Sequence, residues 1–421
     1  MPTPDQLRLL IIILPAILFV MGFRRPIFAV AAYMIIVYCK ASYYYPTLAA
    51  MKVELIFALL ILLMLILKKN FAIRLSPRSD SINRALYWFI ASVAVSFVVS
   101  WNKQYSWDNA VYHFIKTVFL YMMIVAGIED YKDLKFFVWA FVGMFCYLAY
   151  EPAYYFLSGI GGSNQMYGIN YIADVGILAG HVALANNMNQ MIPIAFFLAL
   201  GSMKKYAQIA ASCCLTFFVI SLVGSGSRGG VVGLAVSGCC IVLFSSKRIK
   251  TALIVSLIII VMGASIGSRF MYTASRIDGA QTHGRLTGIT HGLGMIMKGN
   301  IIGVGPGCYL FARGKYFSHT MESHNIYGQI LGDLGIPGMI FWGLFVMKLF
   351  ENIKNLKSIL IEKNQKMEFF YYLMLGLQVS LITRLVISFA SHGLYYFYWY
   401  VVAAIIVSAK RIIYAEMEFS K

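Results

Sequence analysis

The sequence predicts an all-α polytopic integral membrane protein that crosses the bilayer through about 12 to 13 helices. Of its 421 residues, 60% are hydrophobic and only 12% are charged, and the mean hydropathy is +0.74. Segments such as 53–67 (VELIFALLILLMLIL) are apolar on every side, as a lipid-facing helix must be. A soluble core needs fewer apolar residues, and the period-2 alternation of a membrane β-barrel is absent from the sequence.

Apolar segments of the length that a bilayer requires follow one another along the chain. The expected segments are residues 9–23, 26–39, 53–67, 84–100, 114–128, 134–157, 181–201, 206–224, 230–245, 252–267, 336–350, 368–390 and 394–409. The first two are short and are separated only by Arg24 and Arg25, so the helix count at the N-terminus stays open. We expect one transmembrane domain over residues 1–421, without internal repeats.

Basic residues fall in alternate connections between these segments. They are Lys68, Lys69, Arg74, Arg78, Lys132, Lys135, Lys204, Lys205, Lys247, Arg248, Lys250, Lys354, Lys357, Lys363, Lys366, Lys410 and Arg411. The positive-inside rule places these connections and the C-terminus in the cytoplasm. The other connections then face outward, namely 40–52, 101–113, 158–180, 225–229, 268–325 and 391–393.

The outward connection 268–325 is several times longer than an ordinary connection, and long loops in compact proteins are usually functional or disordered. Its apolar and glycine-rich stretch (GLGMIMKGNIIGVGPGCYLF) favours order. We expect at least one amphipathic helix, near residues 288–298, lying against the membrane surface.

The formal net charge of +18 would suggest nucleic acid in a soluble protein, but cytoplasmic Lys and Arg explain much of it in a membrane protein. They do not explain a basic outward loop. That loop contains Arg269, Arg276, Arg285, Lys298, Arg313 and Lys315 against only Asp278 and Glu322. These cations either contact anionic headgroups or bind an anionic substrate such as a phosphate or diphosphate, which suits the bidentate fork of Arg.

Two further arginines could likewise bind a substrate or lie at the membrane surface. Arg228 lies in a glycine-rich turn (GSGSRGG) between two apolar segments, where it either contacts headgroups or binds a substrate. Arg384 lies inside an apolar segment (LITRLVISF). An intramembrane Arg usually lines a functional cavity, although it can also extend to the membrane surface.

His324 stands where the outward loop enters the next apolar segment. Ser323 or Asn325 can cap the helix that follows, and Gly335, Pro337 and Gly338 can kink or pack it. The alternative is that the imidazole takes part in a reaction. Metal binding is disfavoured, because no histidine pair has ligand spacing together with acidic partners and the chain contains no Asp-x-Asp.

The arrangement His324-Asn325-x9-Gly335-x-x-Gly338 resembles the H-[NSQ]-x9-G-x-x-G pattern of bacterial O-antigen ligases and their relatives, which include O-antigen polymerases and O-linked protein oligosaccharide ligases. The stretch from Arg285 to the Gly303-Val-Gly305-Pro-Gly307 run looks like a loop of that family. The turn around Arg228 looks like its Ser-Arg-Gly signature, and Asn186-Asn187-Met188-Asn189 leading to Pro193 is similar to its polar helix start. The likeness is strongest over residues 180–340.

The resemblance implies a GT-C-type glycosyltransferase that moves a glycan from a polyprenyl (undecaprenyl) diphosphate carrier to an acceptor hydroxyl on the periplasmic side of the bacterial inner membrane. It implies an inverting reaction without a metal or another cofactor. Arg228 and Arg285 would hold the diphosphate, with Arg384 as a third candidate from its place in the membrane. His324 would act in catalysis together with Arg285, supported by Asn325, Gly335 and Gly338.

Three acceptors stay open within this family. A ligase uses lipid A-core, a polymerase uses a second carrier-linked repeat unit, and a protein ligase uses Ser or Thr. The compact size and the intact His324 motif favour the ligase. Outside the family, a transporter of lipid-linked glycans would explain Arg384 and the basic outward face, but it predicts repeated halves that the sequence lacks. A non-catalytic assembly partner has no feature in its favour.

Overall fold

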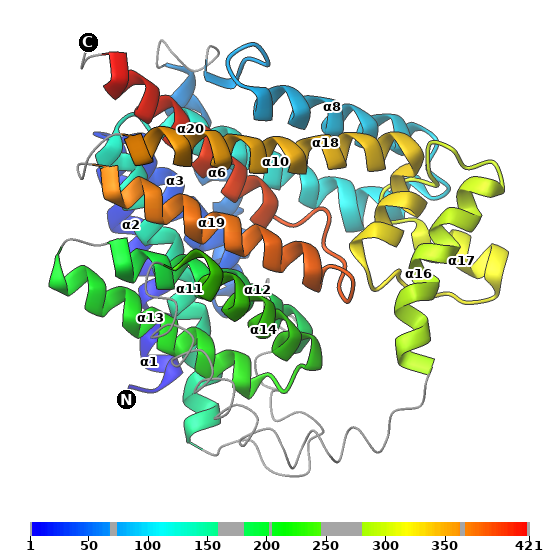
Figure 1. The fold of residues 1–421 in the computed structure, drawn as a ribbon, viewed down its shortest axis with the longest axis horizontal. Coiled ribbons are helices and arrows are strands. Elements are labelled where there is room, and N and C mark those ends of the chain that lie inside the picture. The colour runs from blue at the N-terminus through cyan, green and yellow to red at the C-terminus, as the bar shows by residue number, and fades with distance from the viewer. Residues whose placement is uncertain are drawn as a thin grey trace.

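The computed structural model describes residues 2–67, 74–158, 181–201, 204–245, 280–362 and 367–418, and at residues 181, 228, 280–285 and 362 it describes the backbone alone. Within these residues the chain forms helices and no strand (Figure 1). The helices are α1 (Pro4–Arg8), α2 (Leu10–Gly22), α3 (Pro26–Tyr38), α4 (Ala41–Tyr44), α5 (Pro46–Ala50), α6 (Val53–Ile66), α8 (Ser81–Val98), α9 (Lys103–Ser106), the π-helical turn η1 (Trp107–Val111), α10 (Tyr112–Gly127), α11 (Tyr131–Leu157), α12 (His181–Gly201), α13 (Lys205–Gly224), α14 (Arg228–Phe244), α16 (Ala280–Met297), α17 (Tyr309–Phe317), α18 (Ile326–Glu362), α19 (Glu368–Ile387) and α20 (Tyr398–Glu418).

The predicted fold class is confirmed: the chain is an all-α polytopic membrane protein. In the described ranges, eight helices are long and apolar enough to cross a membrane, and shorter apolar helices accompany them. Each predicted apolar segment overlaps a helix except 252–267, which lies outside the described residues. Helices satisfy every backbone hydrogen bond within one segment, which lipid requires.

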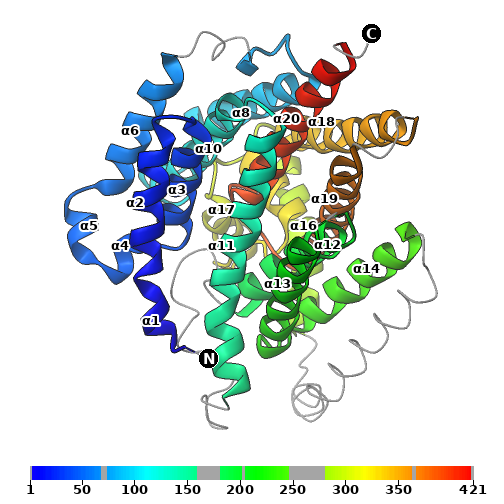
Figure 2. The same cartoon turned by 90° about the vertical axis from the view of Figure 1, so that its left-hand side faces the viewer.

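Helix α20 occupies the middle of the bundle, where it contacts α10, α11, α18 and α19 (Figure 2). Its first half, residues 398–407, is buried. Trp399, Tyr398 and Tyr400 are among the largest fully buried side chains. Dense packing of this kind holds helices together in lipid, where water supplies no hydrophobic driving force between them.

The two short N-terminal segments form an antiparallel pair, α2 and α3, whose turn contains Arg24 and Arg25. Gly22 permits the close approach, because a Cβ atom there would lie 2.5 Å from the Cβ of Ala29. Arg25 ties the turn to the start of α11, with Nη1 at 3.1 Å from Asp130 Oδ2 and 2.8 Å from Asp133 Oδ1. The pair lies on one side of the bundle, away from α14 (Figure 2).

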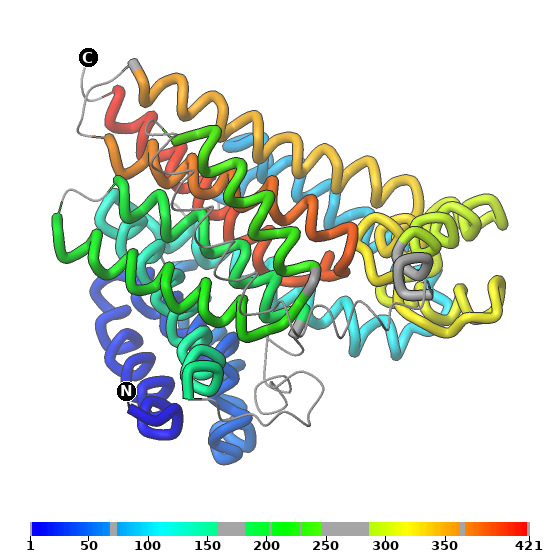
Figure 3. The backbone as a smooth tube through the Cα atoms, turned by 60° about the horizontal axis from the view of Figure 1, so that its bottom comes forward, coloured from blue at the N-terminus to red at the C-terminus, as the bar shows by residue number. Residues whose placement is uncertain are grey.

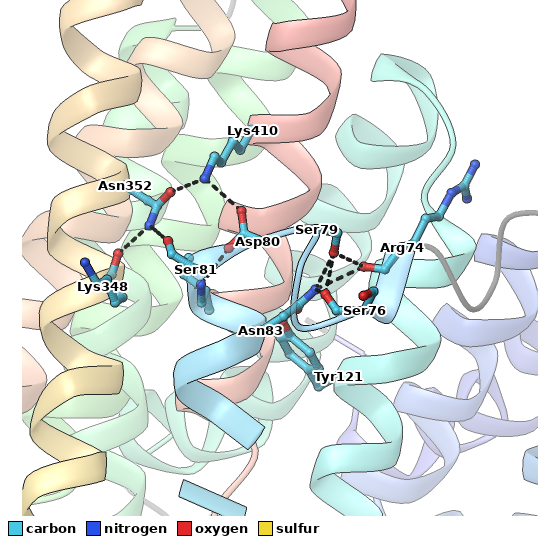
Figure 4. A network of polar contacts seen from close by, with 11 residues as sticks. Arg74, Ser76, Ser79, Asp80, Ser81, Asn83, Tyr121, Lys348, Asn352 and Lys410 are labelled. Carbon is cyan, nitrogen blue, oxygen red and sulfur yellow. Dashed lines mark hydrogen bonds and ion pairs between the residues drawn. The ribbon is translucent and has the colours of Figure 1, made fainter. Parts of the chain in front are cut away.

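A network of polar side chains joins three helices that are far apart in the sequence, at one end of the bundle (Figure 4). Lys410 Nζ of α20 lies 2.8 Å from Asp80 Oδ2 and donates to Asn352 Oδ1 of α18 at 2.7 Å. Asn352 Nδ2 in turn donates to Ser81 Oγ at the start of α8, at 3.0 Å. We call this end of the bundle the Asp80 end.

The opposite end carries α16 and α17, which lie beside the first turns of α18 (Figures 1 and 3). We call it the His324 end, because the residues before α18 lie there together with the last turn of α19. A helix does form at the predicted amphipathic segment 288–298, and it begins earlier, at Ala280. Helix α18 also begins well before the predicted start at residue 336, which the glycine contacts described below explain.

Candidate functional site

His324 is an exposed residue between two fully buried ones, Ser323 and Asn325. Its backbone is in the left-handed region, with φ at 53°. Non-glycine residues enter this region at a cost, and such positions cluster at functional sites. The flanking side chains hold the segment: Asn325 Oδ1 accepts from the Gly328 amide at 2.5 Å and caps α18, and Ser323 Oγ donates to the Asn325 carbonyl at 2.9 Å. Asn325 therefore does cap the helix, and the imidazole next to it lies at the surface of a fixed turn.

Helix α16 crosses this turn with almost no space between the backbones. A Cβ atom on Gly288 would lie 2.5 Å from Asn325 Nδ2, and one on Gly292 would lie 2.9 Å from the Gly328 carbonyl oxygen. Arg285 precedes Gly288 by about one helical turn, because a turn takes 3.6 residues. The backbone of α16 thus brings the position of Arg285 to the neighbourhood of the His324 turn. The side chain of Arg285 lies outside the described atoms.

Helix α18 is kinked at Gly335, whose φ of 65° and ψ of −155° are not helical. Pro337 lacks an amide hydrogen, so it cannot donate to the carbonyl of Asp333 four residues earlier. Gly338 allows the turn to tighten, because a Cβ atom there would collide with the side chain of Leu334. The GxxG pair thus has the kinking role that the sequence left open.

The glycine-rich stretch 299–308 replaces the hydrogen bonds that the kink removes. The Gly305 amide donates to the Asp333 carbonyl at 3.1 Å, and the Val304 amide donates to the Gly332 carbonyl at 2.9 Å. In exchange, the Ile336 amide donates to the Ile301 carbonyl at 2.9 Å. Buried backbone groups need such partners. The two glycine motifs of the sequence are therefore complementary parts of one backbone junction.

Asp333, which the sequence analysis did not single out, joins three segments at this junction. Its Oδ1 accepts from the Tyr309 amide of α17 at 2.9 Å, and its Oδ2 accepts from the hydroxyl of Tyr395 at 3.1 Å. The Ser96 hydroxyl of α8 donates to the Asp333 carbonyl at 2.5 Å. Asp333 is fully buried. It ties α8, α17 and the connection between α19 and α20 to the kink of α18.

The connection between α19 and α20 also borders the site. Gln329 Oε1 accepts from the amides of Gly393 and Leu394 at 3.2 and 3.3 Å, and the Ile326 amide donates to the Ser388 carbonyl at 3.0 Å. These bonds place the His392 ring beside that of His324, with 5.9 Å between the ring centroids.

His392 is partly buried in the connection between α19 and α20. Burial lowers the pKa of His392 from 6.5 to about 4, and the neighbouring His324 and Arg384 also lower it. His392 is therefore neutral near pH 7. His392 was not predicted from the sequence; the signal that points to it is a histidine in a short polar connection on the same side as His324.

Arg384 lies in the last turn of α19, just before this connection, and is only 5% exposed. No carboxylate pairs with it in the described part of the chain, and its Nε atom is buried without a hydrogen-bond partner. The guanidinium lies 5.8 Å from the ring centroid of Trp399, and a Cβ atom on Gly393 would lie 2.8 Å from its Nη2. A buried cation without a carboxylate partner is costly, and intramembrane arginines usually face the interior of a bundle or a cavity.

The backbone of Arg228 begins α14, and Ser227 Oγ caps that helix by accepting from the Gly230 amide at 3.2 Å. Helix α14 runs antiparallel to α19, since Ser237 Oγ lies 2.9 Å from Thr383 Oγ1 while Gly233 contacts Ile387. This direction takes the start of α14 past the last residue of α19, toward the connection that carries His392. The side chain of Arg228 lies outside the described atoms.

Other basic residues of the predicted loop have structural partners. Arg313 is 4% exposed and donates through Nε to His291 Nδ1 at 3.0 Å and through Nη1 to the Glu322 carbonyl at 2.9 Å. The His291 ring stacks on Phe317, and burial and Arg313 lower the pKa of His291. These two residues hold α16, α17 and the segment before His324 together. Arg269 and Arg276 lie outside the described residues.

The fold and this site define a multi-pass helical membrane protein with a histidine pair and a buried arginine gathered at one end of its bundle. Residues 213–343 match the family model of the O-antigen ligase. This segment is similar to the O-antigen ligase family, which is associated with ligase- or polymerase-type glycan transfer at membranes. The match includes Arg228, Arg285 and His324, whereas Arg384 and His392 lie beyond it. A search among curated proteins found no match.

Proposed function

We propose that this protein transfers a glycan from a polyprenyl diphosphate carrier to the hydroxyl of an acceptor glycolipid, as an O-antigen ligase with lipid A-core as acceptor. The His324 end would face the periplasm of a bacterium, with the Asp80 end in the cytoplasm, because basic residues concentrate in the connections of the Asp80 end. The reaction would be inverting and metal-independent, on a GT-C-type scaffold. The observation that carries the proposal is the exposed His324, held in a left-handed turn beside His392 and the buried Arg384.

The proposed chemistry assigns His324 the role of general base. The acceptor oxygen attacks the anomeric carbon, and the bond from that carbon to the diphosphate oxygen breaks. The carrier diphosphate leaves with the electron pair, and His324 takes the hydroxyl proton. A positioned base contributes roughly 10²–10⁴-fold to a rate. An exposed imidazole on a rigid turn suits this role, because the acceptor must reach it from solvent or from the membrane surface.

The leaving diphosphate gains negative charge in the transition state, and preorganised cations stabilise it. We assign this role to Arg228, Arg285 and Arg384. Arg384 has the strongest support, since it is buried without a carboxylate partner in the described residues and its Nε is unsatisfied. For Arg228 and Arg285 the support is the backbone position of α14 and α16 together with the family match.

The same chemistry with a second carrier-linked repeat unit as acceptor would make the protein a polymerase. The arrangement of His324, His392 and Arg384 suits either acceptor, and the family description names the ligase. A transporter would need Arg384 but has no use for an imidazole on a fixed, exposed turn.

The test is to incubate the purified protein with a polyprenyl-diphosphate oligosaccharide, with and without lipid A-core, and each time with and without a chelator. A single product band that depends on lipid A-core supports the ligase. A ladder that forms without lipid A-core identifies a polymerase, and the absence of product with an intact donor contradicts glycan transfer. Loss of product only when the chelator is present contradicts metal independence.

A further inference from the structure

A pocket of about 530 Å³ opens at the Asp80 end, far along the bundle from the His324 turn. It lies between the turn of the α2–α3 pair and the start of α11. Its lining combines an apolar wall with charged side chains: Val20, Met21, Arg24, Arg25, Phe28, Lys132 and Asp133. The proposed reaction gives this pocket no role.

The charges of the pocket are not balanced within the described protein. Arg25 holds both nearby carboxylates, at 3.1 Å from Asp130 and 2.8 Å from Asp133. Arg24 and Lys132 are exposed, and neither pairs with a carboxylate in the ranges that the structure describes. The pocket therefore presents two cations to a ligand from outside the protein.

The apolar wall continues onto a surface that must contact lipid. Ile17 and Val20 on α2 are 53% and 66% exposed, and Phe23, directly after α2, is 71% exposed. Helix α2 belongs to a segment apolar enough to cross a membrane. A soluble phosphate would contact the two cations and make no contact with the apolar wall. A molecule with a phosphate group and acyl chains would use both surfaces. Basic pockets between membrane helices bind anionic headgroups in this manner.

We propose that this pocket binds an anionic phospholipid of the surrounding bilayer. Its phosphodiester contacts Arg24 and Lys132, and its acyl chains lie along Val20, Met21 and Phe28. The ion pairs of Arg25 with Asp130 and Asp133 keep the α2–α3 turn in place beside α11 and so shape the pocket.

The experiment titrates the detergent-purified, full-length protein with dioleoyl phosphatidylglycerol or dioleoyl phosphatidylcholine and counts bound lipids by native mass spectrometry. We expect a phosphatidylglycerol-selective site. The double variant Arg24→Gln/Lys132→Gln should weaken it about 25-fold, since each basic side chain near an anionic surface contributes roughly fivefold. Both side chains are exposed, so the variant should fold normally.

The matched control is Arg84→Gln/Lys354→Gln, which removes an exposed Arg and an exposed Lys at the same end of the bundle, outside the pocket. Its affinity for phosphatidylglycerol should stay within twofold of the parent. An equal loss in the control overturns the proposal, because attraction would then follow overall charge. Competition by glycerol 3-phosphate as effective as that of phosphatidylglycerol also overturns it, in favour of a soluble phosphate ligand.

Discussion

A hydrogen bond joins Gly305 and Asp333 at the kink of α18: the Gly305 amide donates to the Asp333 carbonyl. In a regular helix the amide of residue 337 would donate to this carbonyl, but Pro337 has no amide hydrogen. This bond, at 3.1 Å, explains why an intact glycine-rich stretch and an interrupted helix occur in the same chain. Both partners of this bond are backbone groups, so the contact between the two segments depends on backbone geometry.

Gly305→Ala should destabilise the protein by about 3 kcal/mol or more, through strain at positive φ and a steric collision. Gly305 has φ at 106°, and a Cβ atom there would lie 2.6 Å from the Cα of Ser100. Gly299→Ala is the matched control, because Gly299 has φ at 94° and open space around the added atom. Thermal unfolding in detergent measures both variants. Equal losses would show that the close contact with Ser100 is unimportant.

Arg384→Met should weaken donor binding at least about tenfold while raising the unfolding free energy by roughly 1–4 kcal/mol, since an apolar side chain replaces a buried cation. Arg411→Met is the control: its guanidinium donates to the carbonyls of Val125 and Ile128, so its loss should destabilise. Donor titration and thermal unfolding separate the two effects. A loss of stability in Arg384→Met equal to that of Arg411→Met would contradict an anion-binding role.

Arg228→Ala and Arg285→Ala should each weaken binding of the lipid-linked donor about tenfold or more, because each would remove a charged contact with the diphosphate. Lys298→Ala is the control, since Lys298 is an exposed cation that follows α16 and lies over the Tyr316 ring. A binding titration with the intact donor measures all three. Unchanged affinity in either arginine variant removes that residue from the diphosphate site.

Acid should destabilise the protein through His392. Its pKa is lowered to about 4 in the folded protein, so the folded state binds fewer protons than the unfolded state. The stability contribution is complete above pH 6.5 and declines as the pH falls toward 4, by about 3 kcal/mol. The groups that face this ring are His324 and Arg384. His392→Gln should flatten the decline of unfolding temperature over this range, and an unchanged slope would contradict the assignment.

Much of the fold could be predicted from the sequence because lipid imposes a local rule. Each apolar segment in the described ranges forms a helix, and His324 marks the boundary at which a polar loop meets an apolar segment. The start of α18 could not be predicted in this way. Gly335 and Pro337 end a helix by local rules, but contacts from residues 301–305 supply the missing hydrogen bonds and let the helix extend back to Ile326.

The candidate site was predictable only in part, for a similar reason. His324 and Arg384 were visible as polar groups in apolar surroundings. The positions of His392 and Asp333 depend on hydrogen bonds with residues far away in the chain. Gln329 binds the connection that carries His392, and Tyr395 binds Asp333. Arg313 was grouped, from its charge alone, with the loop cations that contact headgroups or bind an anionic substrate. Its bonds to His291 and Glu322 give it a structural role.

The central claim is that the His324 imidazole performs the proton transfer in glycan transfer, and single-turnover kinetics with a bound lipid-linked donor test it most directly. His324→Gln should slow transfer roughly 10²–10⁴-fold while donor affinity stays within about threefold of the parent, because the base acts in the transition state. His319→Gln, at an exposed histidine of the same segment, should transfer at the parental rate. Parental transfer by the His324→Gln protein would contradict the account.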